Sequence, residues 1–325
     1  MRLLEFESKA ILEKYQIAVP SGTLVTETDS VAIENSVLLK PQVPVGGRQK
    51  AGGILEASTA DEVRAGIKRL LSKDIRGFKA RKILIEEKLD VEKEYFMAIT
   101  CDSVAKSPRA VFSIAGGVDI ESVAMRAPEK MRQEVFAIRS RLPQYRAREI
   151  IAETGVSGKR LLGLSTIFSK LAEIFLDYDA TLAEINPLVL TKGGRLVALD
   201  CHLEIDDDAL FRHNELVALG KDVNRFEAAR SVTEFERQAE AIDQIDHRGV
   251  AGRVIEFEGD LGLIIGGGGA SLTAFDAVQA HGGKPANYCE IGGNPSVRKV
   301  EALTGLILSK PNVKRIAVIM NVVSN

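Results

Sequence analysis

Apolar and polar residues alternate with two different periods along the first two hundred residues. Apolar groups recur at helical spacing over residues 5–15, 60–71 and in stretches over 127–176. Apolar runs typical of strands lie between these segments, over residues 23–26, 36–40, 82–87, 94–101 and 109–120. Strands that alternate with helices in this way predict an α+β or α/β layered domain, in which helices cover the faces of sheets.

The pattern changes beyond residue 255. A strand, a glycine run, a helix, a strand, a helix and a strand follow one another over 261–265, 266–269, 270–280, 286–291, 294–309 and 314–321. This order is typical of a doubly wound parallel sheet, which binds ligands beyond the carboxyl ends of its strands. Because Asn325 follows the third strand so closely, we expect either that the chain is trimmed or that another polypeptide completes the sheet.

The charge pattern suggests where these two parts meet. Residues 225–250 are rich in charge and poor in aromatic side chains, which predicts a helical linker. We therefore expect an α/β protein in three parts, with an α+β domain over 1–225, a helical linker over 226–255 and a partial doubly wound domain over 256–325. A chain of 325 residues is long enough for two domains with full cores.

Residues 184–200 read as a β-hairpin with polar residues at the outer ends of its strands. Two apolar runs flank a Lys-Gly-Gly turn, in which glycine supplies positive φ angles. Pairing across the turn would bring Asp200 close to Glu184 and Asn186. Two carboxylates and an amide oxygen form the all-oxygen site that Mg²⁺ uses. The alternative is three solvated polar residues on a surface hairpin.

A loop over 41–53 carries positive charge and four glycines. It follows a predicted buried strand that ends in Lys40, and it contains Arg48 and Lys50. Glycine lets backbone N–H groups approach an anion closely, and the cations neutralise phosphate charge. The loop is not a Walker A sequence, which requires GxxxxGK[ST] at the start of a helix. Phosphate binding and a basic, mobile hairpin tip both fit this composition.

Two carboxylates lie at the ends of neighbouring predicted strands. Glu86 ends one buried strand and Glu94 opens the next. Carboxylates in these places can accept hydrogen bonds from an adenine amino group and from ribose hydroxyls. Solvated carboxylates at strand ends are the alternative.

Composition narrows the class of protein. Hydrophobic residues make up 45% of the chain and charged residues 27%, and the net charge of −2 offers no basic surface for nucleic acid or an anionic membrane. No apolar run approaches the ~20 residues of a membrane helix, and charges interrupt the N-terminus too early for a secretory signal. Three widely spaced cysteines suit a reducing compartment. We expect a cytoplasmic protein.

Several motifs in order along the chain resemble one family. They are Glu5-Phe6-Glu7-Ser8-Lys9-Ala10, the loop from Leu39 to Gly53, Gly116-Gly117-Val118-Asp119 and Glu184-Ile185-Asn186-Pro187-Leu188. Together they resemble the β subunits of ADP-forming succinyl-CoA synthetases over essentially all 325 residues. The resemblance implies an ATP-grasp domain followed by a flavodoxin-like CoA-ligase domain, with ATP, Mg²⁺ and coenzyme A as ligands. It also implies a hetero-oligomer with an α-type subunit that carries a phosphohistidine and the coenzyme A site.

The same resemblance implies roles for individual residues. Those matching the family's phosphate-binding lysine and loop are Lys40, Gly47, Arg48 and Gln49. Glu86 and Glu94 match the residues that hold adenine and ribose, Leu89 matches a main-chain contact, and Asn186 and Asp200 match the Mg²⁺ ligands. None of the four histidines lies in a matching phosphohistidine motif, so we expect the phosphorylated histidine on the partner.

Three glycine-rich loops depart from the succinate family in one direction. The departures are Gly266-Gly267-Gly268-Gly269-Ala270-Ser271 in place of Asn-Gly-Ala-Gly-Leu, Glu290-Ile291-Gly292-Gly293-Asn294-Pro295-Ser296 in place of Asp-x-Gly-Gly-Gly, and Asn321-Val322-Val323-Ser324-Asn325 in place of Asn-Ile-Phe-Gly-Gly. These loops resemble those of ATP-citrate lyase and citryl-CoA synthetase, where they surround citrate. A hydroxylated tricarboxylate needs more room, supplied at Gly266, and more donors, supplied by Ser271, Ser296 and Asn325.

We therefore predict an ATP- and citrate-dependent CoA ligase subunit whose substrate-binding residues are Gly266, Gly267, Gly268, Ala270, Ser271, Gly292, Gly293, Ser296, Ser324 and Asn325. Cleavage of citryl-CoA would belong to a partner with a citrate-synthase-like domain. The first alternative is a succinyl-CoA synthetase β subunit that uses succinate and whose loops have drifted. The second is a nucleotide-sensing subunit that kept the fold without turnover.

Overall fold

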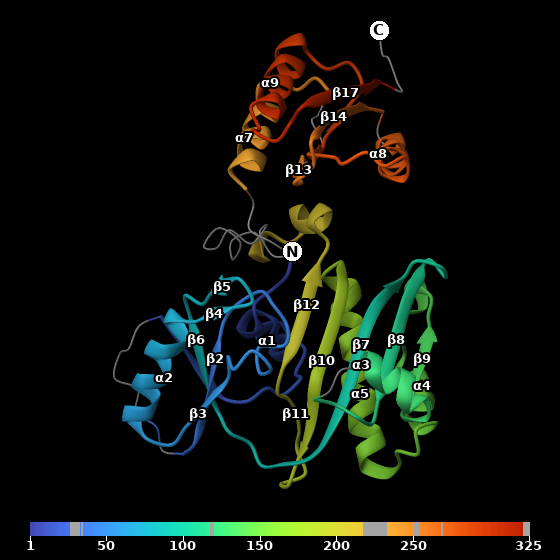
Figure 1. Cartoon of the computed structure of the whole chain (residues 1–325). Helices are drawn as coiled ribbons and strands as arrows, with labels where there is room; N and C mark the ends of the chain where they lie inside the picture. The colour runs from blue at the N-terminus through green and yellow to red at the C-terminus, as the bar shows by residue number, and fades with distance from the viewer. Residues whose placement is uncertain are drawn as a thin grey trace. The chain divides into compact units, whose positions relative to one another are not determined.

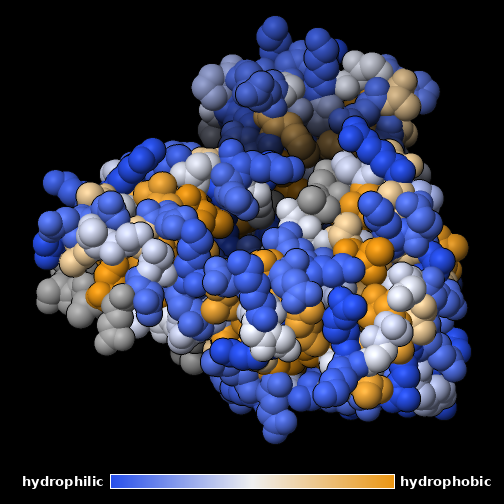
Figure 2. Space-filling view, turned by 90° about the horizontal axis from the view of Figure 1, so that it is seen from below, coloured by the Kyte–Doolittle hydropathy of each residue, from blue (hydrophilic) through white to orange (hydrophobic). Residues whose placement is uncertain are grey.

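The chain forms two compact units, Met1–Ala228 and Ala229–Asn325 (Figure 1). A computed structural model describes residues 1–26, 33, 35–117, 120–216, 233–249, 254–267 and 269–320. Among these residues, no helix is both long enough and apolar enough to cross a membrane. The face seen in Figure 2 is covered mainly by hydrophilic side chains with hydrophobic ones in scattered clusters, as expected where most apolar residues are in cores.

A small antiparallel sheet lies at the start of the first unit. Its strand order is β1 (Gly22–Val25), β6 (Ile83–Glu87), β2 (Val37–Pro41) and β3 (Leu55–Ala57). Helix α2 (Ala60–Ser72) begins at Thr59, whose side chain accepts a hydrogen bond from the Glu62 N–H, and its apolar residues pack with those of β2 and β6. A two-stranded hairpin, β4 (Asp74–Ile75) and β5 (Phe78–Lys79), follows α2. This sheet positions Lys40 and Glu86 on adjacent strands.

A larger antiparallel sheet forms the rest of the first unit. Its strands run in the order β11 (Leu196–Ala198), β10 (Ala180–Thr191), β7 (Val91–Asp102), β8 (Ser107–Ser113) and β9 (Met131–Val135), and β12 (Cys201–Ile205) also pairs with β10. Helices α4 (Gln144–Ala152) and α5 (Gly158–Asp177) pack on each other, and α5 covers the sheet over β7 and β10 (Figure 1). Helix α1 (Glu5–Lys14) lies against β12.

The predicted hairpin of residues 184–200 is confirmed, with a bend near its outer end. Leu188 pairs with Ala198 and Leu190 with Leu196 across a turn in which Gly194 has a φ of +79°. The returning strand breaks at residues 199–200 into β11 and β12, and the Asn186 N–H donates to the Asp200 carbonyl at 3.0 Å. Asn186 and Asp200 therefore lie side by side, as the sequence predicted.

The second unit holds a parallel three-stranded sheet in the order β16 (Glu290–Ile291), β14 (Leu261–Gly266) and β17 (Arg315–Met320). Helices α8 (Ala270–Ala280) and α9 (Val297–Leu308) provide the crossovers, so the predicted doubly wound order is present. The predicted strand over 286–291 is instead two short strands, because β15 (Asn287–Tyr288) turns to pair antiparallel with β13 (Ile255–Glu256).

Two segments differ from the sequence predictions. In the predicted linker, α7 (Glu234–Asp243) is helical but packs on α9 and buries Phe235 and Ala239 in the core of the second unit. Residues 131–135 were predicted as helix and form β9 instead, because they pair with β8 along five residues. Short 3₁₀ turns at 128–130 and 138–140 flank β9, and helix α3 (Ile120–Arg126) precedes it. Tertiary pairing outweighs local helix propensity here.

The core of the first unit depends on large side chains that α5 places on the sheet. Phe168 is fully buried, and its ring centroid lies 6.1 Å from that of Phe112 on β8. We expect Phe168→Ala to lower the free energy of unfolding by about 3–5 kcal/mol, because a cavity remains. Phe211→Ala is the control, since Phe211 is 73% exposed, and should cost under about 0.5 kcal/mol. Urea denaturation measures both, and similar costs for the two variants would contradict this core assignment.

Candidate functional site

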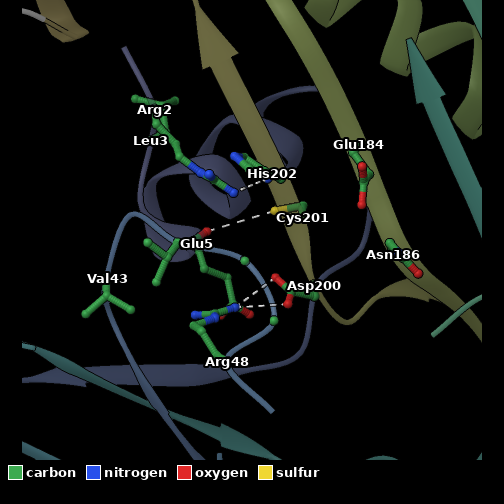
Figure 3. A pocket seen from close by; sticks show the side chains of 13 residues that line it. Arg2, Leu3, Glu5, Val43, Arg48, Glu184, Asn186, Asp200, Cys201 and His202 are labelled. Atoms are coloured by element: carbon green, nitrogen blue, oxygen red, sulfur yellow. Dashed lines mark hydrogen bonds and ion pairs between the residues drawn. The ribbon is translucent and has the colours of Figure 1, made fainter. Parts of the chain in front are cut away.

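A cavity of about 150 Å³ in the first unit brings the glycine loop, the hairpin and the N-terminal segment together (Figure 3). The residues that line it are Arg2, Leu3, Glu5, Val43, Val45, Gly46, Gly47, Arg48, Glu184, Asn186, Asp200, Cys201 and His202. Its walls therefore combine a cationic, glycine-containing loop with carboxylate and amide oxygens, a combination suited to an anion and a divalent cation together.

The buried carboxylate of Glu5 is the centre of this site. Glu5 is the first residue of α1 and is 4% exposed. Its Oε1 accepts from Lys9 Nζ at 2.7 Å and Lys40 Nζ at 2.9 Å, and its Oε2 pairs with Arg48 Nη2 at 2.5 Å. Burial alone would raise the pKa of Glu5, but these three cations outweigh burial and hold its pKa well below the ordinary value of 4.5. Glu5 is therefore charged at neutral pH.

Glu86 forms the second anion of the cluster. Only 1% of Glu86 is exposed, and its carboxylate contacts Lys9 and pairs with Lys40 Nζ at 2.7 Å. Lys40 Nζ also donates to the Leu199 carbonyl at 2.8 Å. Burial would lower the pKa of Lys40, but Glu5 and Glu86 outweigh it and raise that pKa. In this structure the carboxylate predicted to face adenine is thus engaged by two buried lysines.

Arg48 links this cluster to the hairpin. Its Nη2 donates to both carboxylate oxygens of Asp200, at 2.9 and 3.0 Å, and its Nη1 donates to the Pro41 carbonyl at 3.2 Å. Burial acts to lower the pKa of Arg48, while Asp200 and Glu5 raise it above its ordinary value. The Asp200 side chain is 37% exposed, so it can be reached from solvent while Glu5 cannot.

The oxygen atoms on the hairpin are of the chemical types that Mg²⁺ prefers as ligands. Asp200, Glu184 and Asn186 line the same cavity, and Asn186 Oδ1 accepts from the Gly117 N–H in this structure. Burial raises the pKa of Glu184. The described residues hold no group of three or more His, Cys, Asp and Glu arranged for a metal ion. Mg²⁺ here would therefore need waters and substrate phosphates for its remaining ligands, as it commonly does.

Gly116 and Gly117 lie close to Tyr95, Glu94 and Asn186. A Cβ on Gly116 would lie 2.4 Å from the Tyr95 carbonyl oxygen, and one on Gly117 would lie 2.1 Å from Glu94 Oε2. Gly117 has a φ of +67°, and its N–H donates to Asn186 Oδ1 at 2.9 Å. Only glycine fits at these two positions. Gly117 thus lies between Glu94 and Asn186, a predicted metal ligand.

Of the remaining predicted nucleotide residues, Gly47 lines the cavity, whereas Gln49 and Leu89 are not among its lining residues. Gly47 has a φ of +69° and is exposed, as is Gln49 in the turn that follows. Leu89 is half-buried just after β6. The sequence predictions missed Glu5 and Lys9 as site residues. Their spacing of four on one helix was visible in the sequence, but it is an ordinary helix ion-pair spacing until the fold shows that both are buried.

In the second unit, the side-chain arrangement differs from the one expected for a citrate loop. The room expected at Gly266 is not free, because a Cβ there would lie 2.7 Å from the Met320 sulfur on the neighbouring strand. Ser271, expected as a donor, is fully buried, and its hydroxyl contacts Tyr288 Oη at 2.5 Å and Glu290 Oε2 at 3.3 Å. Both residues thus serve packing within the unit in this structure.

The other predicted substrate residues are placed at the same end of the parallel sheet or are not described. Gly267 has a φ of +136°, and Ala270 is the first residue of α8. Gly292 and Gly293 follow β16, and Ser296 caps α9 by accepting from the Lys299 N–H at 3.2 Å. Gly268, Ser324 and Asn325 lie outside the described residues.

Replacing Glu5 with Gln removes the charge on which three cations converge. We expect Glu5→Gln to lower the free energy of unfolding at pH 7 by about 3–5 kcal/mol. Because the pKa of Glu5 is depressed by folding, its stabilisation is full above pH 4.5 and is lost as pH falls toward the lower folded value. The difference between wild type and variant should therefore narrow in acid, as measured by urea denaturation at pH 7 and pH 4.

Glu7→Gln is the matched control for this variant. Glu7 is equally buried on the same helix, but its carboxylate accepts from the Leu4 N–H, a contact that glutamine can keep. We expect it to cost under about 1 kcal/mol. Equal stability of Glu5→Gln and wild type at pH 7 would contradict the proposed charge balance.

Comparison with known proteins identifies the family. The ATP-grasp domain family matches residues 2–190. The chain is 39% identical over 319 residues to the β subunit of ADP-forming succinate–CoA ligase from Methanocaldococcus jannaschii, covering 97% of this chain and 81% of that protein. It is 36% identical over 319 residues to the β subunit 2 of the same enzyme from Archaeoglobus fulgidus, covering 97% and 80%.

Solved structures agree at the level of the fold. ATP citrate lyase from Methanothrix soehngenii, in complex with citrate and coenzyme A, superposes with a TM-score of 0.63 at 20% identity, covering 98% of this chain and 80% of that one. The family and the fold predicted from the motifs are thus confirmed. This chain belongs to the family of ADP-forming succinate–CoA ligase β subunits and carries their ATP-grasp domain.

Proposed function

We propose that this chain binds ATP in the cavity of its first unit and acts as the nucleotide-binding subunit of an ADP-forming carboxylate–CoA ligase, with succinate as the carboxylate. The observation that carries the proposal is the convergence of Lys40 and Arg48 with Asn186 and Asp200 in the ATP-grasp domain. Two cations near an all-oxygen ligand set suit a polyphosphate with its divalent ion.

The residues of the cavity then take distinct roles. Arg48 lines the cavity and Lys40 shares the Glu5 carboxylate with it, so both contribute positive charge that neutralises phosphate. The backbone at Gly47 approaches the phosphates without a side chain in the way. Asn186 and Asp200 would hold Mg²⁺, which when bound neutralises and orients phosphate oxygens. Glu94, which lies against Gly117, is available for a ribose hydroxyl. Leu89 and Gln49 keep the main-chain and phosphate contacts predicted for them as part of the proposal, whereas the buried Glu86 is held by Lys9 and Lys40 and acts on the site through them.

The phosphoryl group is proposed to pass to a histidine of an α-type partner that also binds coenzyme A. His202, which lines the cavity, is held by Arg2 at 2.9 Å and lies 3.3 Å from Glu204. His213 pairs with Asp179 at 2.8 Å, and the His281 ring contacts a carbonyl of its own helix. These engaged rings favour a histidine supplied by the partner. The relatives are named as β subunits, which supports such a partner.

Succinate is favoured over citrate by the level of similarity. Relatives that match nearly the whole chain at 33–39% identity are named as succinate–CoA ligases. The ATP citrate lyase structures are 19–20% identical and support the fold alone. Citrate is kept as the second candidate because of the loop sequences around Gly266–Ser271 and Glu290–Ser296. The engagement of Gly266 and Ser271 within the unit weakens the argument for it.

A substrate test separates these proposals. The chain is combined with its α-type subunit, and coenzyme A-dependent release of ADP from ATP is followed with succinate and citrate offered separately. We expect turnover with succinate and at most about a hundredth of that rate with citrate, since a mismatched carboxylate loses several charge-assisted contacts.

The other possible outcomes of this assay would support the alternative functions. Turnover with citrate and not with succinate would overturn the succinate proposal in favour of the second candidate. Binding of ATP without turnover on either carboxylate, in a complex that contains both subunits, would instead indicate a nucleotide-sensing subunit. The control is the same complex without coenzyme A, which should release ADP only in proportion to phosphorylation of the partner.

A further inference from the structure

Arg48 has one buried and one accessible partner at the same end of its side chain. Its Nη2 pairs with Glu5, which is 4% exposed, and with Asp200, whose side chain is 37% exposed. The backbone of Arg48 is fixed as well, because its carbonyl accepts from the Gly53 N–H at 2.8 Å. The contact with Asp200 is therefore the link most easily exchanged with an incoming ligand, while Glu5 keeps the guanidinium at the site.

The contact with Asp200 conflicts with a metal ion on the same carboxylate. Arg48 Nη2 donates to both Asp200 oxygens, at 2.9 and 3.0 Å. A Mg²⁺ ligated by either oxygen sits about 2 Å from it. The ion and the guanidinium would then be roughly 4 Å apart, where repulsion between a divalent and a monovalent cation is large near a protein surface. One of the two must leave unless negative charge arrives with the metal.

A polyphosphate brings that negative charge. The six charged side chains of the cluster balance, since Lys9, Lys40 and Arg48 oppose Glu5, Glu86 and Asp200. A divalent cation alone adds two positive charges to this balanced set, whereas a metal–nucleotide complex adds net negative charge. The phosphates also offer Arg48 a bidentate partner in place of Asp200.

We propose that Arg48 controls access of the divalent cation to Asp200, so that metal binding depends on the nucleotide that draws Arg48 away. This inference rests on the proposed ATP site and adds a gating role to it. Arg48 acts as a positioning residue through its exchange between Asp200 and phosphate. The loop that carries it is thus an electrostatic switch as well as a phosphate clamp.

The test is a titration with Mn²⁺ as the probe, followed by electron paramagnetic resonance on the full chain, first without nucleotide and then with ADP. We expect Arg48→Met to bind Mn²⁺ alone at least about tenfold more tightly than wild type, because the competing cation is gone. The same variant should show a smaller gain in Mn²⁺ affinity when ADP is added. A variant that only damaged the site would bind Mn²⁺ more weakly, so it could not show tighter Mn²⁺ binding without nucleotide together with a smaller gain on addition of ADP.

Three variants serve as controls. Arg48→Lys keeps a positive charge near Asp200 and should resemble wild type in Mn²⁺ affinity without nucleotide. Lys88→Met removes a cation that is not part of the cavity lining and pairs with the exposed Glu56, so it should leave that affinity within about twofold. Arg48→Met combined with Asp200→Asn should lose the gain. Retained cooperative unfolding in urea shows that each variant folds.

The outcomes distinguish the proposed control of metal access by Arg48 from the proposed nucleotide and metal site on which it depends. Unchanged or weaker Mn²⁺ binding by Arg48→Met, or an equal gain in Lys88→Met, overturns the proposed control of metal access by Arg48 and leaves the proposed nucleotide site untouched. If wild type with ADP binds Mn²⁺ no better than Asp200→Asn does, the metal site itself is wrong and the gate falls with it.

Discussion

The proposed nucleotide site depends on one buried carboxylate. Glu5 contacts Lys9, Lys40 and Arg48, which come from a helix, a strand and a loop that are separated in sequence. Each of these cations is itself buried, so without an anion its desolvation would be costly. The Glu5 carboxylate therefore offsets the positive charge of these three side chains in the folded chain, as phosphate groups would when a nucleotide binds. Glu5 also holds Lys9, Lys40 and Arg48 together in the structure without a ligand.

The second unit follows a different constraint. Its parallel strands β14, β16 and β17 end together, and the glycine-rich loops continue from those ends. Yet two features that suggested citrate serve the unit itself, since Met320 fills the space beside Gly266 and Ser271 binds Tyr288. In our proposal, nucleotide binding belongs to the first unit, and the loops predicted to select the carboxylate belong to the second unit. The proposal of nucleotide binding is based on the charge cluster, and the proposal of succinate as the carboxylate is based on the named relatives.

The sequence predicted the parts of the fold that local pattern controls. The hairpin with Asn186 beside Asp200 was predictable because its turn and apolar alternation are local. The cluster around Glu5 was not, because a Glu–Lys pair four residues apart looks the same on a surface helix as on a buried one. The strand β9 was missed for a related reason, as its partner β8 lies some twenty residues away. At Gly266 the sequence could not show that the Met320 side chain of a neighbouring strand lies beside it.

The charge cluster in the first unit is the proposed site for nucleotide phosphates. Calorimetric titration of the chain with Mg-ADP tests it most directly when Lys40→Met is compared with Lys88→Met, since Lys88 forms only an exposed pair with Glu56 among its described ion pairs. Binding at one site in wild type and Lys88→Met, weakened at least about tenfold in Lys40→Met, is the predicted result. Equal affinities in the three proteins would contradict the account.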